Sequence, residues 1–368
     1  MKLKQKRLIN KKTILPVPSL LERGWGEDMQ ENKTISNSTS FALASKVKDY
    51  FLLIKFTLSF MVVFSTVVSY LLAPNIKFDL LQVLLLFAGG MLVTGSANAI
   101  NQVLEKDTDA TMKRTAKRPI ASGRMSVKEG WAFVIISGLL GLYIMYTFSA
   151  EAMWLSLASL LLYGFVYTPL KKVNSIAVLV GAIPGALPCL IGWVASFSNG
   201  QLNSWTGGWI LFTIQFLWQF PHFWAIAWVA HKDYTAAGFK LLPSDKGPTK
   251  FTALQAIVYS AMMIPVGLLP YVYHISGMVS MWILLGCNLF MVYVSVLLFI
   301  KMDIAAARKV MFSSYFYLMI VFLSLYADKK TLPIAVNVQE GDATMMIERF
   351  STDKKEKNKS IAFAIIKK

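Results

Sequence analysis

Long apolar runs, each followed by a short polar connection, repeat along most of the chain. A helix needs about 20 mainly apolar residues to cross a bilayer, and nine runs meet this requirement. They are residues 50–73, 80–104, 131–149, 151–168, 176–197, 207–230, 252–272, 278–300 and 309–327. The pattern therefore predicts an all-α, polytopic membrane protein, built as a bundle of nine transmembrane helices.

The polar segments divide the chain into three parts. Residues 1–47 are polar and lack the apolar core of a signal peptide, so we expect a disordered N-terminal segment. Residues 48–327 carry the nine spans and form the predicted membrane domain, while residues 328–368 form a second, Lys-rich polar tail.

Basic residues collect in every second connection between the spans. The connections 105–130, 168–175, 231–251 and 301–308 hold seven, two, four and two Lys or Arg residues, whereas the alternate connections hold almost none. Because cytoplasmic loops carry an excess of Lys and Arg, the chain is predicted to have its N-terminus in the cytoplasm and its C-terminus outside. The lysines from Lys329 onward are the exception. We expect a multi-pass protein of the bacterial cell inner membrane.

Composition supports this class of protein. The chain is 55% hydrophobic and only 15% charged, with a mean hydropathy of +0.52, whereas soluble domains carry about 25% charged residues. Its net charge of +17 lies in tails and connections, which suits contact with the lipid bilayer and indicates no nucleic-acid partner. Cys189 and Cys287 form no CxxC or CxxCH motif, so neither a disulfide nor covalently attached haem is indicated.

The second span ends in an unusual series of polar residues. Asn101, Glu105 and Asp109 are four residues apart and fall on one face of a helix, while Asp107 points elsewhere. An amide and two carboxylates are hard oxygen ligands of the kind that bind Mg²⁺ together with substrate phosphates. The alternative is a solvated helix end that only anchors the membrane boundary.

Cations follow directly after this series, and the neighbouring connections add more. Lys113, Arg114, Lys117 and Arg118 come first, and Arg and Lys are the residues that bind a diphosphate directly. Tyr167, Lys171 and Lys172 close the fourth span, where the two lysines also fit an ordinary anchoring role.

The sixth span carries two further candidates in the stretch WQFPHFWAIAWVAHKDYTAAGFKLLP. His222 is an ionisable residue at membrane depth, which marks a functional candidate, although a structural histidine paired with a neighbouring carbonyl is an equal alternative. Asp233 ends this span on the same side as Asp109. Two acidic helix ends with nearby cations, beside an apolar cavity, fit a substrate with a diphosphate head and a hydrocarbon tail.

The stretch NQVLEKDTDATMKRTAKRPI resembles the first aspartate-rich motif of the UbiA superfamily of intramembrane prenyltransferases, N-x-x-x-D/E-x-x-x-D. The resemblance covers about residues 48–327, and nine spans match that family's architecture. The stretches RTAKRPIASGRM, PHFW and DYTAAGFKLLP resemble its haem branch rather than its quinone branch.

The resemblance implies a role for each candidate residue. Asn101, Glu105, Asp109 and Asp233 are the implied catalytic residues, with Mg²⁺ held by the three carboxylates. The implied diphosphate-binding residues are Arg114, Arg118, Tyr167, Lys171 and Lys172. His222 is implied to contact haem, as an iron ligand or a propionate partner.

It also implies a reaction and its partners. The farnesyl group of farnesyl diphosphate is transferred to a vinyl group of haem B, and water adds to give haem O. Mg²⁺ is the implied cofactor, while haem B is a substrate rather than a prosthetic group. Haem A synthase or oxidase assembly factors are implied as downstream partners, and the active site faces the cytoplasm.

Two residues depart from the family pattern, and two other functions remain open. Glu105 replaces the more common Asp, and Ala237 stands where a DxxxD motif beginning at Asp233 has its second carboxylate. One alternative is an aromatic polyprenyltransferase that acts on a quinone precursor. The other is a membrane haem carrier or transporter, although the chain shows no matching pair of Gly- or Pro-interrupted segments in two halves.

Overall fold

The predicted bundle of membrane-spanning helices is confirmed. The computed structural model describes residues 44–74, 76–199, 204–244 and 246–330, and apart from one isolated bridge between Ser276 and Lys329 these residues form helices and connections. Eight helices are long and apolar enough to cross a membrane. A bent pair, Ala44–Leu53 and Phe56–Leu72 (α2), makes the ninth span. The parts of the two polar tails at 1–43 and 331–368 lie outside the described residues.

The other spans follow the predicted order. They are α3 (Leu80–Leu104), α5 (Val127–Phe148), α6 (Ala150–Leu161), α8 (Ala177–Val194), α9 (Thr206–Val229), α11 (Lys250–Val272), α12 (Met278–Lys301) and α13 (Ile304–Ala327). The span of α6 continues through a π-helical turn, η1 (Leu162–Tyr167), into α7 (Thr168–Leu170), and a 3₁₀ turn, η2 (Ala195–Asn199), follows α8. Two short helices, α4 (Lys106–Thr111) and α10 (His231–Ala236), follow α3 and α9.

Side-chain caps explain why two helices begin before the predicted spans. The Ser126 side chain accepts a hydrogen bond from the Glu129 amide and starts α5, and the Asp303 side chain accepts one from the Ala306 amide and starts α13. Such caps satisfy amide groups of the first turn that have no partner within the helix. Both helices therefore begin four or five residues before the predicted spans, and they take in Lys128 and Glu129 of α5 and Arg308 of α13.

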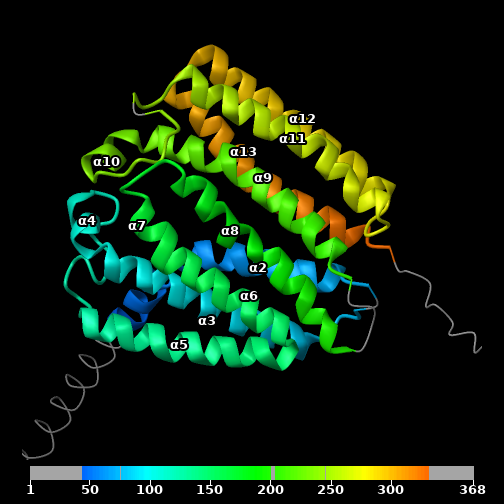
Figure 1. The fold of residues 1–368 in the computed structure, drawn as a ribbon, viewed down its shortest axis with the longest axis horizontal. Coiled ribbons are helices and arrows are strands. Elements are labelled where there is room, and N and C mark those ends of the chain that lie inside the picture. Colours follow the sequence, from blue (N-terminus) through cyan, green and yellow to red (C-terminus); the bar gives the residue numbers. More distant parts are fainter. Residues whose placement is uncertain (1–43, 75, 200–203, 245, 331–368) are drawn as a thin grey trace, which may run out of the picture.

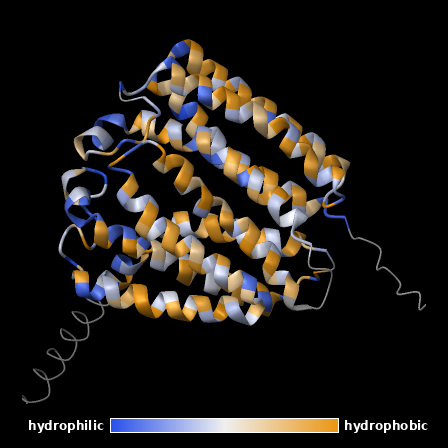
Figure 2. Cartoon of the chain, in the orientation of Figure 1, coloured by the Kyte–Doolittle hydropathy of each residue, from blue (hydrophilic) through white to orange (hydrophobic). Residues whose placement is uncertain are grey.

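The long helices form two groups that lie side by side (Figure 1). One group contains α2, α3, α5, α6 and α8, and the other contains α9, α11, α12 and α13. Close packing within the first group depends on small residues: a Cβ atom at Gly192 of α8 would collide with the backbone carbonyl of Thr66 in α2. In Figure 2 the hydrophobic residues run along the helices, and hydrophilic residues gather at the end that carries α4 and α10.

Lys329, the exception to the charge pattern, has a structural role at the opposite end of the bundle. Its ammonium donates hydrogen bonds to the carbonyls of Leu71, Ala73 and Ile76, at 2.6, 2.8 and 3.3 Å. These carbonyls lie at or just beyond the C-terminus of α2, where helix carbonyls lack partners and a cation is favourable. These hydrogen bonds join the C-terminal end of α13 to the C-terminal end of α2.

Candidate functional site

The acidic series at the end of α3 keeps its helical register through a break in the helix. Glu105 is non-helical, yet its amide still bonds to the Asn101 carbonyl and its carbonyl accepts from the Asp109 amide at 2.7 Å. Asn101, Glu105 and Asp109 are 1%, 4% and 1% exposed, while Asp107 is exposed. The predicted shared face is therefore confirmed, and it points into the protein.

The first span is broken where it passes this face, and α3 holds the break in place. The Gln102 side chain donates to the carbonyls of Leu52 and Leu53, both at 2.9 Å, and the Asn98 side chain donates to the Ile54 carbonyl. Lys55 follows with a φ of 50°, in the left-handed region that residues with a side chain seldom adopt. Such strain often marks a functional position.

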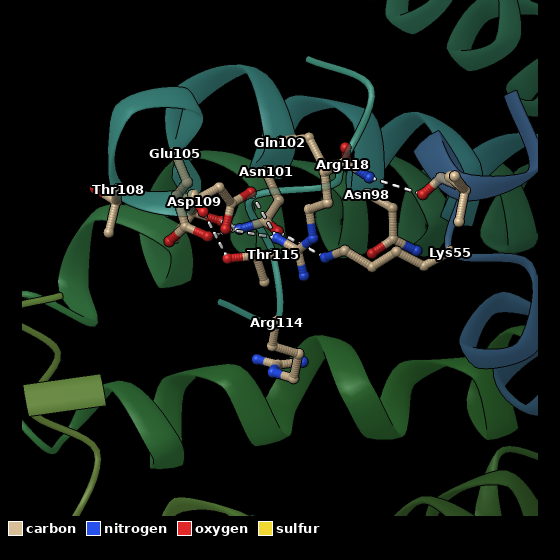
Figure 3. A network of polar contacts seen from close by, with 12 residues as sticks. Lys55, Asn98, Asn101, Gln102, Glu105, Thr108, Asp109, Arg114, Thr115 and Arg118 are labelled. Atoms are coloured by element: carbon tan, nitrogen blue, oxygen red, sulfur yellow. Dashed lines mark hydrogen bonds and ion pairs between the residues drawn. The ribbon is translucent and has the colours of Figure 1, made fainter. Parts of the chain in front are cut away.

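The break brings Lys55 to the acidic series, which begins a chain of polar contacts (Figure 3). The Lys55 ammonium donates to Asn101 Oδ1 at 2.6 Å, and Asn101 Nδ2 donates to Glu105 Oε2 at 2.7 Å. The Lys171 ammonium lies 2.6 Å from Glu105 Oε1. Glu105 Oε1 is thus held by the Lys171 ammonium in a buried ion pair.

The carboxylate of Asp109 forms an ion pair with Arg118. Arg118 approaches both carboxylate oxygens through one guanidinium nitrogen, at 2.8 and 2.6 Å. The turn between the two residues is fixed by Thr115, whose hydroxyl donates to the Asp109 carbonyl at 2.9 Å. Each carboxylate thus has a basic partner. Asp109 pairs with Arg118 of the connection after α4, and Glu105 pairs with Lys171 of the connection after η1.

The connection after η1 adds two lysines with different surroundings. Lys171 is 8% exposed and its ammonium lies over the rings of Tyr167 and Phe239, at 5.0 and 5.1 Å from the centroids. Burial lowers the pKa of Lys171 below its ordinary value, and the nearby Glu105 carboxylate opposes this change. Lys172 is exposed and donates to the Thr108 hydroxyl at 2.5 Å.

The short helix α10 faces this cluster with Tyr234 rather than with Asp233. Arg114 donates to the Tyr234 hydroxyl at 3.4 Å, and its guanidinium lies 5.9 Å from the ring centroid. Burial raises the pKa of Tyr234, and the guanidiniums of Arg114 and Arg118 act in the opposite direction. Asp233 is exposed and makes no ion pair or side-chain hydrogen bond with any described residue.

His222 lies within α9, two helical turns or about 11 Å before the C-terminal end of that helix. It is 7% exposed, its ring is stacked on Trp218 at 4.6 Å, and its Nδ1 lies 2.7 Å from the Ser314 hydroxyl of α13. The hydrogen-bond partner of His222 is therefore a hydroxyl, whereas a purely structural histidine was expected to pair with a neighbouring carbonyl. Nε2 has no hydrogen bond to a described residue, so the role of His222 stays a prediction.

A narrow cavity of about 80 Å³ begins next to the acidic face and extends from it into the interior of the bundle. Asn98 of α3 and Tyr163 of η1 line it at the end near the site, and their side chains are linked by a hydrogen bond of 3.4 Å. Along α3 it reaches Gly90, about 12 Å deeper. Most of its other lining residues are apolar, including Val62, Met145 and Ile191.

The structure therefore brings together most of the predicted residues. Asn101, Glu105, Asp109, Arg118, Lys171 and Tyr167 meet at one end of the bundle, with Lys172 and Arg114 at its edge. The sequence prediction missed Lys55 and Tyr234. A signal for Lys55 was present, since it is the one charge in the apolar run FLLIKFTLSFMVV. Tyr234 gave no comparable signal beside Asp233.

The fold and the site define a multi-pass membrane protein with a buried cluster of carboxylates and cations above an apolar cavity. The comparison of sequences gives its family, since residues 62–322 match the UbiA prenyltransferase family. The chain belongs to this family. A protoheme IX farnesyltransferase from Cytophaga hutchinsonii is 43% identical over 288 residues, covering 78% of this chain and 99% of that protein. One from Flavobacterium johnsoniae is 37% identical over 299 residues, covering 79% and 97%.

Solved structures share the fold at lower identity. A digeranylgeranylglyceryl phosphate synthase superposes with a TM-score of 0.65 and 22% identity, covering 77% of this chain and 98% of that chain. A UbiA homologue from Archaeoglobus fulgidus bound to GPP and Mg²⁺ superposes with a TM-score of 0.53 and 16% identity, covering 75% and 99%.

Proposed function

We propose that this prenyltransferase moves the farnesyl group of farnesyl diphosphate to a vinyl group of haem B and so makes haem O. The observation that carries the proposal is the 43% identity to a protoheme IX farnesyltransferase along nearly all of that protein's length. The site supports it with a diphosphate-binding arrangement above an apolar cavity, and the sixth span supports the haem acceptor through PHFW and DYTAAGFKLLP.

The charges of the site suit a diphosphate. Three cations, Lys55, Lys171 and Arg118, surround two carboxylates, Glu105 and Asp109, which leaves a net charge of +1 around the buried cluster. Arg114 and Lys172 at the edge add two positive charges and Asp233 at the mouth removes one, which gives +2. Uncompensated charge in a buried site is costly, so an anion that shares these cations stabilises the site.

The same residues fit Mg²⁺. Within the described part of the chain, no group of three or more His, Cys, Asp or Glu residues is placed to hold a metal. Mg²⁺ does not need one, since it binds through one or two carboxylates plus substrate phosphates and waters. Asn101 Oδ1 and the carboxylates of Glu105 and Asp109 share one buried face, where they are paired with Lys55, Lys171 and Arg118. Mg²⁺ bound there supplies positive charge next to the leaving diphosphate.

Asp233 is proposed as a further carboxylate at the mouth of the site. It lies beside Tyr234 on α10, which contacts Arg114. Its exposed position leaves it free to reach a metal ion shared with the diphosphate.

In the reaction, the cations exchange partners. Lys171 and Arg118 pair with Glu105 and Asp109 and turn to the diphosphate as it binds. The allylic C–O bond then breaks, and its electron pair leaves with the diphosphate, where the fixed cations stabilise the new charge. The vinyl group forms the new C–C bond, and the resulting cation takes up water and loses a proton.

The cavity below Asn98 and Tyr163 marks the path of the hydrocarbon chain. At about 80 Å³ it is smaller than a farnesyl chain, so the helices around it must separate as the substrate binds. The rings of Tyr163 and Tyr167 lie 5.3 Å apart where this cavity meets the polar cluster. Aromatic faces stabilise an allylic cation, and apolar walls keep water away from it until the acceptor has reacted. The haem acceptor is proposed to contact His222, whose Nε2 has no hydrogen bond to a described residue.

The remaining proposals concern the setting of the enzyme. The basic connections around the site favour a position at the cytoplasmic side of a bacterial inner membrane. The catalytic domain is taken to be residues 48–327, with residues 1–47 and 328–368 outside it. Haem O would pass to a haem A synthase or to oxidase assembly factors.

A membrane assay with two acceptors tests the proposal. Membranes that contain the chain are incubated with Mg²⁺, farnesyl diphosphate and either haem B or 4-hydroxybenzoate, and products are separated by chromatography with mass detection. We expect haem O from haem B and no prenylated benzoate. Prenylated benzoate without haem O would instead establish the quinone-type alternative, while no product in a folded protein would contradict both.

A further inference from the structure

A second cavity lies outside the catalytic cluster, in a groove between α12 and α13. It has a volume of about 570 Å³ and opens away from the bundle, because Tyr293, Phe312 and Phe316 on its sides are 57%, 54% and 68% exposed. The sides of the groove are mainly apolar and aromatic. It is therefore a lipid-facing groove rather than part of the reaction chamber.

The groove is charged at one end only. Arg308 and Lys309, in the second turn of α13, line it at the end of the bundle where the catalytic cluster lies. Both side chains are exposed, and neither forms an ion pair with a carboxylate in the described ranges. Asp303, five residues before Arg308, caps α13. Arg308 and Lys309 therefore make the mouth of the groove positive.

The length of the groove suits a lipid chain. On α13 the lining runs from Arg308 to Ile320, which lies twelve residues further along the helix, or about 18 Å at 1.5 Å per residue. Half of a hydrocarbon core of about 30 Å is about 15 Å. An acyl chain from a headgroup at Arg308 and Lys309 would therefore run the full length of the groove within one leaflet.

We propose that this groove binds an anionic phospholipid, with one acyl chain between α12 and α13 and its phosphate against Arg308 and Lys309. Basic pockets between membrane helices are known to bind such headgroups. The bound lipid supports α13, whose opposite face carries the Ser314 hydroxyl that contacts His222. The inference is independent of which prenyl acceptor the enzyme uses.

Competitive lipid retention tests the proposal. The full chain is delipidated in detergent, supplied with equal amounts of phosphatidylglycerol and phosphatidylcholine with identical acyl chains, and analysed by native mass spectrometry. With two cations at the mouth, we expect phosphatidylglycerol to be retained in preference by on the order of tenfold. The R308Q/K309Q double variant should lose most of this preference.

Two further variants separate this site from general charge and from general lipid coverage. Lys48 and Lys128 are exposed at the same end of the bundle and do not line the groove, so K48Q/K128Q should keep the full preference. Ser313→Phe fills the groove but keeps both cations, and it should lower retention of both lipids. An unchanged preference in R308Q/K309Q, an equal loss in K48Q/K128Q, or unchanged retention in Ser313→Phe overturns the proposal. Displacement of the retained lipid by farnesyl diphosphate at matching concentration would also overturn it, because the groove would then hold a substrate.

Discussion

The ends of α3 and α9 are built from the same backbone device but carry different chemistry. Each long helix stops at one non-helical residue, Glu105 at φ −100° and ψ 13° or Ala230 at φ −94° and ψ 13°, and each is followed by a six-residue helix. The positions that face the site in the first case are Asn101, Glu105 and Asp109. The corresponding positions in the second are 226, 230 and 234, which hold Ile, Ala and Tyr.

This difference shows that the backbone alone does not make a metal site. The α3–α4 end places its carboxylates on the buried face, whereas the α9–α10 end places its carboxylate, Asp233, one residue out of register and exposed. A shift of one residue turns a helical side chain by 100°. The two ends are therefore unequal, and we propose that α3–α4 contributes more than α9–α10 to binding the metal and the diphosphate.

The largest loss of activity is expected when an acid is removed from the α3–α4 end. Asp109→Ala should lower kcat/KM by at least about a hundredfold, because it removes fixed charge from the place where the leaving group is stabilised. Haem O formation in membranes measures the effect. Asp107→Ala is the matched control, since Asp107 lies two residues away and is exposed. Equal losses in both variants would show that the shared face does not define the site.

The second test concerns the acid of α9–α10. Asp233→Asn should lower kcat/KM by about tenfold, less than Asp109→Ala, because a carboxylate at the mouth contributes one ligand among several. Titration of activity with Mg²⁺ should show a weaker apparent affinity for the metal. Full activity at low Mg²⁺ would leave α3–α4 as the whole metal site and remove Asp233 from it.

The third test compares two adjacent cations. Lys171→Met should raise KM for farnesyl diphosphate by about fivefold, because its buried ammonium makes a charged contact that water cannot replace. Lys172→Met should raise KM less, because this side chain is exposed. Steady-state kinetics measure both, with thermal unfolding in detergent to confirm that each variant is folded. A larger rise in KM for the Lys172 variant would mean that Lys172, and not Lys171, is the main diphosphate contact of this pair.

The smallest expected effect is at Tyr234. Tyr234→Phe removes the hydroxyl that accepts from Arg114 but keeps the ring, so kcat/KM should fall about twofold to threefold. Thr235→Val is the control, since Thr235 is exposed on the same short helix. A loss as large as that of Asp233→Asn would mean that the phenol itself takes part in binding the diphosphate.

Much of this protein was determined by the sequence alone. The nine spans follow from apolar length, and the shared face of Asn101, Glu105 and Asp109 follows from a four-residue spacing, because the helix period is a local property of the chain. The likeness of the first acidic series to the UbiA family was visible for the same reason. These features depend on neighbours in sequence and not on how the bundle is packed.

Only the tertiary structure decided which cations meet the acids. Lys55 reaches Asn101 because Asn98 and Gln102 of α3 hold open a break in the first span, and neither helix shows this alone. Tyr234 rather than Asp233 meets Arg114 because residue 234 keeps the register of α9 and the connection after α4 lies beside α10. The groove of Arg308 and Lys309 likewise exists only between two packed helices. Contacts between distant segments depend on the packing of the bundle, which no local spacing records.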